Sequence, residues 1–307
     1  MAAYYHCAAR RGPYFEGWYL KCQTRDGKAL ALIPALHIDS AGQRGASLQV
    51  LTDSGSCWLE YPAQEFRACE DRFCIHMGPN LFSYQDIWLD VEQKELSLHG
   101  TLHNGLFKAL RSDIMGPFRF FPGMECVHGV ISMGHPLDGA LRLNGETLDF
   151  SGGTGYIETD RGRSFPSVYL WTQCIWREPP GGSLMLSIAA IPLAAGHFTG
   201  CICAVLWQGR EYRLATYRGA RVERWSAGGA AIRQGKYRLT ADLLTERPQP
   251  LRAPVEGRMG RTIRESLCAG VRYRFWKGET LLFEHTDLHA SFEYAEARSR
   301  DVSSSAT

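Results

Sequence analysis

The 307-residue sequence has no excess of one charge, because 34 Lys and Arg nearly balance 32 Asp and Glu. The arginines are scattered through apolar runs, so the chain lacks a basic face of the kind that binds nucleic-acid phosphates. It also lacks an uninterrupted apolar run of about 18 residues, the length that a membrane-spanning helix needs. We therefore expect no nucleic-acid partner and no transmembrane segment.

The first twelve residues contain no apolar stretch like that of a signal peptide. This absence predicts a cytoplasmic protein, whose contact with a membrane would be transient and serve to collect a ligand. Ten cysteines are present, but most lie inside apolar segments, as Cys174, Cys201 and Cys203 do. That placement favours reduced, buried thiols over a disulfide framework. The spacing of Cys201 and Cys203 does not fit a CxxC zinc or redox pair.

The sequence contains no Walker A loop, no GxGxxG, no GxSxG and no HExxH motif. These absences exclude the commonest nucleotide-binding proteins, serine hydrolases and metalloproteases. We expect neither a metal ion nor a cofactor.

Alternation of apolar and polar residues with a period of two dominates the chain, and no segment of about 12 residues has the pattern of an amphipathic helix. The pattern predicts an all-β protein. Residues 141–150 predict a hairpin with Asn144 and Gly145 at its tip, since this dipeptide suits a type I′ turn. Further strands are expected at 29–39, 168–177, 183–193, 197–208, 211–217, 230–235, 236–245, 270–276 and 280–293, with breaks at 179–182, 228–229 and 248–254.

The second half carries about eight such strands by itself, and a glycine-rich stretch at residues 152–155 suits a passage between two units. We predict two lipocalin-like antiparallel β-barrels or sandwiches packed together, at residues 1–150 and 151–295, followed by a disordered, serine-rich tail at 296–307. An eight-stranded barrel has room for one small ligand. The 14 Phe, 13 Tyr and 8 Trp would wall such a cavity or simply fill a core.

The segment PYFEGWYLK at residues 13–21 places charge among aromatic residues, where an unpaired buried carboxylate is costly. On a strand, Glu16 and Trp18 would point one way and Tyr19 the other. A second segment of this kind, GYIETDRGRSFPSVYLW, occupies residues 155–171. Both segments are candidates for a functional site.

These segments resemble motifs of the tocopherol cyclase family, which read approximately FEGWYFK and Y-x-EK-[ND]-WG-x-SFP-x-x-x-x-W-x-Q. MECVHGVISM at residues 124–133 resembles the bacterial branch of that family, and PLRAPVEGRMGRTIRESLCAGVRYRFW at residues 250–276 resembles its late LRAP segment. The similarity runs over about residues 13–293. This chain departs from the family pattern at Thr159, where the family has lysine, and at Arg161, where it has tryptophan.

The resemblance implies paired lipocalin-like barrels, in agreement with the two predicted units, and closure of a chromanol ring on a prenylated quinol or a related isoprenoid. An alkene would be protonated to a tertiary cation, which the neighbouring phenol oxygen would capture. This chemistry needs no metal or redox cofactor. It needs a carboxylic acid kept protonated by burial, exclusion of water, and aromatic faces that stabilise the cation.

Within this framework Asp160 is the preferred proton donor, followed by Glu158 and then Glu16. His128 would orient a phenol as a general base, or would be a buried histidine with satisfied hydrogen bonds. The side chains expected to line the substrate site are Trp18, Tyr19, Tyr156, Phe165, Tyr169 and Trp171.

Asp160 and Glu16 also have purely structural alternatives. Asp160 would pair with Arg161 or Arg163 at a barrel mouth, and Glu16 would cap buried backbone or pair with an arginine of the late strand at 270–276.

Two alternative functions accompany the cyclase. One is a non-catalytic carrier or sensor of a hydrophobic ligand, and the other is an isoprenoid hydratase that admits water to the same cation.

Overall fold

The computed structural model describes residues 4–121, 124–178, 181–193 and 196–296. Most of these residues lie in two antiparallel sheets. Helix in this part of the chain is confined to short 3-10 turns, η1 (Ala63–Glu65), η2 (Gly116–Phe120) and η3 (Thr216–Arg218). The predicted all-β class is confirmed. None of these described helices is long and apolar enough to cross a membrane.

The first sheet has twelve strands in the order β4-β3-β2-β1-β12-β10-β9-β8-β7-β6-β5, with β11 paired to β10. Its strands are β1 (Tyr14–Gln23), β2 (Ala29–Ile38), β3 (Arg44–Thr52), β4 (Ser56–Tyr61), β5 (Phe66–Ala68), β6 (Cys74–Met77), β7 (Asn80–Ser83), β8 (Asp86–Gln93), β9 (Leu96–Asn104), β10 (Cys126–Leu143), β11 (Glu146–Asp149) and β12 (Gly153–Gly162).

The second sheet has ten strands in the order β16-β15-β14-β13-β22-β21-β19-β18-β17, with β20 paired to β21. Its strands are β13 (Val168–Trp176), β14 (Gly182–Leu193), β15 (Gly196–Trp207), β16 (Arg210–Ala215), β17 (Arg221–Ser226), β18 (Gly229–Gln234), β19 (Tyr237–Thr245), β20 (Gln249–Val255), β21 (Arg258–Lys277) and β22 (Thr280–Glu296).

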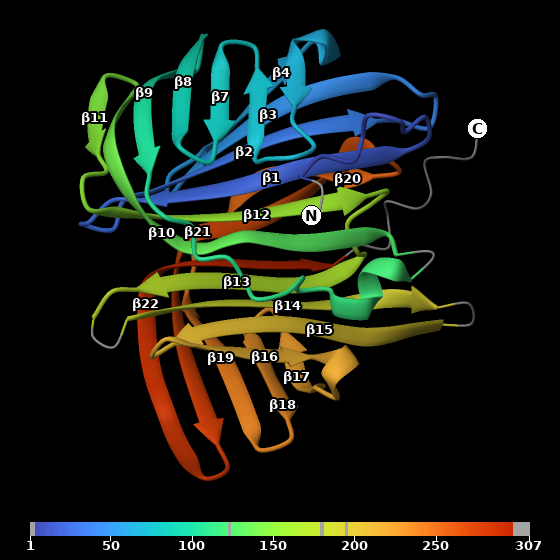
Figure 1. The fold of residues 1–307 in the computed structure, drawn as a ribbon, viewed down its shortest axis with the longest axis vertical. Helices are drawn as coiled ribbons and strands as arrows, with labels where there is room; N and C mark the ends of the chain where they lie inside the picture. The colour runs from blue at the N-terminus through green and yellow to red at the C-terminus, as the bar shows by residue number, and fades with distance from the viewer. Residues whose placement is uncertain (1–3, 122–123, 179–180, 194–195, 297–307) are drawn as a thin grey trace.

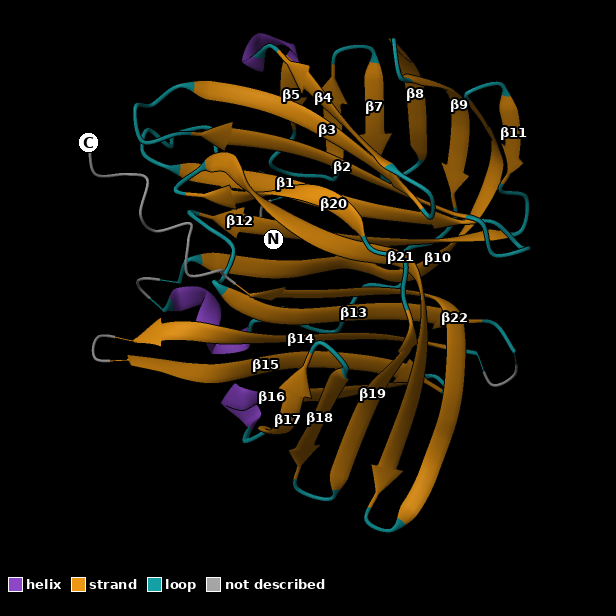
Figure 2. Ribbon diagram, turned by 180° about the vertical axis from the view of Figure 1, so that it is seen from behind, coloured by secondary structure: helices purple, strands orange, loops and turns teal. Residues whose placement is uncertain are grey.

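The two sheets form the two halves of the molecule, with the long strands β10, β12, β13 and β14 running across the middle (Figure 1). The same division is seen from behind (Figure 2). Each sheet has its own apolar core, and a third cluster of buried side chains lies where the sheets meet. Because β2 packs on β21 and β10 packs on β14, strands from both halves enclose this third cluster.

The predicted hairpin at residues 141–150 is confirmed. Leu143 at the end of β10 pairs with Glu146 at the start of β11. Asn144 and Gly145 have φ angles of 49° and 89°, and these positive values at both central positions are what a type I′ turn requires.

Two boundaries expected from the sequence differ in the structure. Strand β12 was expected to open the second unit, but it pairs with β1 and β10 in the first sheet, so the chain changes sheets at residues 163–167 rather than near 150. The expected break at 248–254 is largely strand β20, which pairs only with β21. An edge strand tolerates proline because one of its sides needs no ladder hydrogen bonds. The predicted tail beyond Glu296 and the expected break at 179–180 lie outside the described residues.

Candidate functional site

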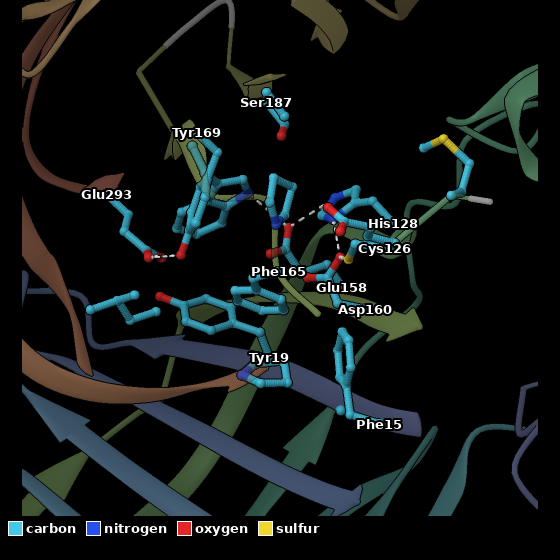
Figure 3. A pocket seen from close by; sticks show the side chains of 18 of the residues that line it. Phe15, Tyr19, Cys126, His128, Glu158, Asp160, Phe165, Tyr169, Ser187 and Glu293 are labelled. Atoms are coloured by element: carbon cyan, nitrogen blue, oxygen red, sulfur yellow. Dashed lines mark hydrogen bonds and ion pairs between the residues drawn. The ribbon is translucent and has the colours of Figure 1, made fainter. Parts of the chain in front are cut away.

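A pocket lies between the two sheets, lined by residues of β1, β10 and β12 from the first and of β13, β21 and β22 from the second (Figure 3). Its volume is about 170 Å³, counted as the space that the centre of a water molecule can occupy, and its walls are mostly apolar. The interiors of the two curved sheets are filled by their own apolar cores. This pocket therefore lies at the junction of the halves, not inside a barrel as the sequence led us to expect.

Strand β12 divides its residues between the pocket and the first core. Glu158 and Asp160 line the pocket, whereas Ile157 on the same strand belongs to the first core. By the same alternation Thr159 and Arg161 lie on the face turned away from the pocket. The hydroxyl of Thr159 donates to the backbone oxygen of Gly17, at 2.9 Å. The two positions that depart from the family motif are therefore not part of the pocket wall.

Three polar side chains meet at one end of the pocket. Nδ1 of His128 lies 3.0 Å from Oδ1 of Asp160, and its Nε2 lies 3.4 Å from Oε2 of Glu158. The second contact is not a hydrogen bond, because its geometry does not allow one. Asp160 Oδ1 also accepts a hydrogen bond from the thiol of Cys126, at 3.3 Å. No ion pair joins Asp160 to Arg161 or Arg163 among the described residues. The pairing with arginine that was the alternative to a catalytic role for Asp160 is therefore not observed.

Glu158 is held by one of its two oxygens. Oε2 accepts hydrogen bonds from the Tyr156 hydroxyl at 2.5 Å and from the Trp171 indole Nε1 at 3.1 Å. Oε1 has no hydrogen-bond partner among the described residues. The carboxyl is thus anchored from behind, and Oε1 remains available to a molecule in the pocket.

Burial sets the charges of this cluster. It raises the pKa of Glu158 to about 8; the nearby positive charge of His128 acts in the opposite direction, and the carboxylate of Asp160 raises the value further. Burial lowers the pKa of His128, but the carboxylates of Asp160 and Glu158 more than offset this, and the result is raised to about 9. Near neutral pH we therefore expect His128 to be cationic and Glu158 to keep its proton.

His128, Glu158 and Asp160 also have the composition of a metal site, since one ligand atom from each lies within 4.8 Å of the others. The sequence did not suggest this. Their existing bonds favour a protonated cluster, because the Glu158 oxygen nearest to His128 already accepts from Tyr156 and Trp171. A histidine must also lose its proton to bind a metal, which the two adjacent carboxylates oppose.

A second acidic group in the pocket was missed by sequence reasoning. Tyr19 donates a hydrogen bond to Glu265 on β21, and Tyr169 donates one to Glu293 on β22 (Figure 3 shows the second pair). Both acids occupy buried positions of strands that carry several other charged residues. The sequence alone therefore gave no signal that set these two acids apart.

The pKa values of this second group are also raised. Burial raises the pKa of Glu265 to about 7, although the hydrogen bond from Tyr19 and the charge of Lys21 act against it. Burial, followed by the negative charge of Glu265, raises the pKa of Glu293 well above its usual value. The pocket therefore contains several carboxyl groups that retain protons at unusually high pH.

The structure brings most of the predicted lining residues together. Tyr19, Tyr169 and Trp171 line the pocket, with the Tyr19 and Trp171 rings 5.2 Å apart in an edge-to-face arrangement. Phe165 also lines it and packs edge-on against Tyr169, at 5.8 Å. His128 joins them as described above.

Three predicted residues are placed differently. Glu16 faces the first core, where Oε1 lies 2.7 Å from His6 Nδ1 and Oε2 accepts from the His6 backbone nitrogen at 2.8 Å. Glu16 accepts a hydrogen bond from a backbone nitrogen, as one of the two structural alternatives for it predicted. Its ion-pair partner, however, is His6 and not an arginine of the late strand. Trp18 touches the pocket edge, yet its ring stacks on Phe66 in the first core, because even-numbered residues of β1 point there. Tyr156 lies behind Glu158 instead of in the pocket wall.

The fold and site define a class of protein: two large curved antiparallel sheets, packed face to face, with an apolar pocket at their junction. No family model and no curated protein sequence matches this chain. Solved structures do match its fold.

A protein from Nitrosomonas europaea, provisionally assigned as AttH, is similar with a TM-score of 0.55 and 12% identity over 92% of this chain and 93% of that one. CghA, solved with Sch210972, is similar with a TM-score of 0.62 and 9% identity over 92% and 89%. Kievitone hydratase from Nectria haematococca has a TM-score of 0.50 and 10% identity over 93% and 90%. At these identities the shared property is a lipocalin-type β fold, and these structures do not bear on membership of the tocopherol cyclase family.

Proposed function

We propose that this protein is a tocopherol-cyclase-like enzyme that closes a chromanol ring on a prenylated quinol, with Glu158 as the proton donor. One observation carries the proposal: a buried carboxyl with a pKa near 8 has one oxygen anchored and the other free in an aromatic-walled pocket. This differs from the order expected from the sequence, in which Asp160 came first. Asp160 instead pairs with His128.

The reaction is an isomerisation without a redox step. The proton on Glu158 Oε1 passes to the less substituted alkene carbon, which forms a C–H bond and leaves a tertiary cation. The phenol oxygen attacks this cation to form the ring C–O bond, and the phenol proton returns to the Glu158 carboxylate. The acid is thereby regenerated, and substrate and product have the same composition.

The pocket wall supplies the other two requirements of this chemistry. The faces of aromatic rings stabilise a cation by about 0.5–2 kcal/mol each, and Tyr19, Tyr169 and Trp171 all line the pocket. Its mostly apolar walls disfavour the water that would otherwise capture the cation. The departures at Thr159 and Arg161 remove no group from this wall, since both lie on the other face of β12.

The fold similarity to kievitone hydratase favours a second candidate function, hydration of an isoprenoid alkene. A hydratase would use the same acid and the same cation but would admit water. A non-catalytic carrier of a prenylated quinol is the remaining alternative.

Incubation of the purified protein with geranylgeranyl and phytyl quinols, followed by mass and absorption spectra, separates these functions. Unchanged mass with a chromanol spectrum supports the cyclase, a gain of one water supports the hydratase, and recovery of unchanged ligand that co-purifies with the protein supports the carrier. Glu158→Gln should lower turnover by about 10²–10⁴, the usual contribution of a general acid. Glu16→Gln removes a buried carboxyl of the neighbouring strand that faces away from the pocket, and should leave turnover unchanged.

A further inference from the structure

Glu265 and Glu293 face each other across neighbouring strands. They are direct partners in the antiparallel register of β21 and β22, and both line the pocket. Side chains at such positions have Cβ atoms about 4.5–5.5 Å apart. The two residues are only 2% and 6% exposed, so two acids are held close together in a nearly dry environment.

No cation neutralises this pair among the described residues. Two positive groups act on the pair, but each has other hydrogen-bond partners: Lys21 donates to the backbone oxygen of His289, and Arg261 donates to the backbone oxygens of Pro166 and Ser167. Burying carboxyls without a paired charge is costly, and natural proteins tolerate the cost most often where the groups act on a ligand.

The carboxyl oxygens of the pair differ in whether they have hydrogen-bond partners. Oε1 of Glu293 accepts from Tyr169, and Oε1 of Glu265 accepts from Tyr19. Glu265 is also hydrogen-bonded to Ser291. Oε2 of Glu293 has no partner in the described part of the chain, although the residue lines the pocket. Burial and the charge of Glu265 raise the pKa of Glu293 well above its usual value, and burial raises the pKa of Glu265 to about 7. Two buried carboxyls this close together readily share one proton, because both cannot easily be charged at once. The pair then holds one donor and one acceptor side by side.

A hydroxyl group is the ligand group that satisfies both members, because it accepts one hydrogen bond and donates another. A quinone carbonyl or a methyl ether accepts only, so it cannot donate a hydrogen bond to the member that lacks a proton. Trp171 connects this pair to the proposed acid: its indole donates to Glu158, and its backbone is the β13 partner of Glu293. One aromatic side chain thus separates the two polar ends of the pocket.

We propose that Glu265 and Glu293 form a hydroxyl-recognition subsite, which selects a ligand with a second hydroxyl group at the end remote from the reacting alkene. The subsite rests on the proposed function for its substrate, and it deepens that function by assigning specificity-determining residues. It favours the quinol over the quinone and over the quinol methylated on its remote oxygen.

The test measures binding by tryptophan fluorescence, under anaerobic conditions, for three probes: geranylgeranyl benzoquinol, its remote-oxygen monomethyl ether and the corresponding quinone. Wild-type protein should bind the quinol at least about tenfold more tightly than either relative, since a hydrogen bond to a charged group and an unpaired buried group have effects of this size. Glu265→Met and Glu293→Met should remove most of the preference. Glu16→Met makes the same change at a buried acid outside the pocket and should retain it.

Equal binding of the three probes by wild-type protein would overturn the subsite, as would a preference that survives in both pocket variants or a failure to bind any probe. The wild-type comparison needs no substitution, so an unfolded variant leaves the proposal testable. Cyclisation is assayed separately. Turnover without a hydroxyl preference overturns the subsite alone, whereas a preference without turnover overturns the cyclase and keeps the subsite.

Discussion

Two buried carboxyls on adjacent strands have different chemistry because of how their oxygens are used. Both oxygens of Glu16 are occupied by His6, through its ring and its backbone nitrogen. Within the part of the chain that the structure describes, only one oxygen of Glu158 has hydrogen-bond partners. A carboxyl that serves as an acid needs a free oxygen facing its substrate, and of these two residues only Glu158 has one.

The rate of cyclisation should fall as pH rises through about 8, since Glu158 must be protonated to act and its pKa is raised to about 8. Below pH 8 Glu158 is protonated, and the rate should level off. The measurement is kcat/KM against pH between 6 and 10 with a prenylated quinol, because kcat/KM reports the pKa values of the free enzyme. A rate that stays constant through pH 9 would exclude Glu158 as the donor whose proton limits turnover.

Asp160 should act through His128 rather than on the substrate. Among the groups that raise the pKa of His128, the charge of Asp160 has the largest effect. In Asp160→Asn the His128 pKa should therefore fall from about 9, as followed by NMR of the imidazole signals. Asp113→Asn removes a carboxyl with a smaller effect on His128 and serves as the matched control. Equal shifts in both variants would contradict the assigned pairing.

Strand β1 serves two faces of the molecule at once. Trp18 and Leu20 belong to the first core, while Gly17 and Tyr19 line the pocket. A Cβ atom built on Gly17 would lie 3.3 Å from the Cβ of Ala35, which also lines the pocket, so a larger residue would crowd the pocket wall. One face of β1 thus packs in the first core, and the other face lines the pocket.

Gly17→Val should fill part of the pocket and weaken binding of a prenylated quinol by about tenfold or more, since overpacking costs about 1–3 kcal/mol. Tryptophan quenching measures the affinity, and circular dichroism checks that the β spectrum persists. Gly12→Val, at an exposed position with open space around its Cβ, is the control and should bind normally. Normal binding by Gly17→Val would place the ligand elsewhere.

The junction between the two sheets concentrates buried acids, and this gives the whole molecule a pH-dependent stability. Glu158, Glu265 and His128 have folded-state pKa values raised to about 8, 7 and 9. Each therefore stabilises the folded state below its unfolded pKa, and this contribution is lost as pH rises through the folded value. Burial lowers the pKa of His37 and His135, which acts in the opposite sense, but only below about pH 6.5, the ordinary histidine value.

The free energy of unfolding should therefore decrease as pH rises from 6.5, through Glu265 up to about pH 7, through Glu158 up to about pH 8 and through His128 up to about pH 9. The lowered pKa of buried Lys21 acts in the opposite sense. Urea unfolding at several pH values measures this free energy. Glu265→Gln should flatten the part of the decrease near pH 7, because it removes one of the titrating groups. A free energy that rises over this range would mean that the acids at the junction are not held in their protonated forms.

Much of the architecture follows from local patterns in the chain. Alternation with a period of two predicts the strands because successive side chains on a strand point to opposite faces, and Asn144 with Gly145 predicts its turn because both tolerate positive φ. The segment at 155–171 was identified as a site because acids among aromatic residues are costly to bury. None of these inferences needed knowledge of distant residues.

The pocket and its chemistry depend on contacts between segments far apart in the chain. Alternation separates Glu158 from Thr159 but does not tell which face of β12 meets the second sheet. Glu265 and Glu293 lie more than 100 residues after Glu158, and only the register of β21 and β22 makes them opposing partners. Glu158 keeps its proton because of burial between the two sheets, which the charge of His128 opposes and the charge of Asp160 supports. A pKa reports the whole surroundings of a group, which the neighbouring sequence does not contain.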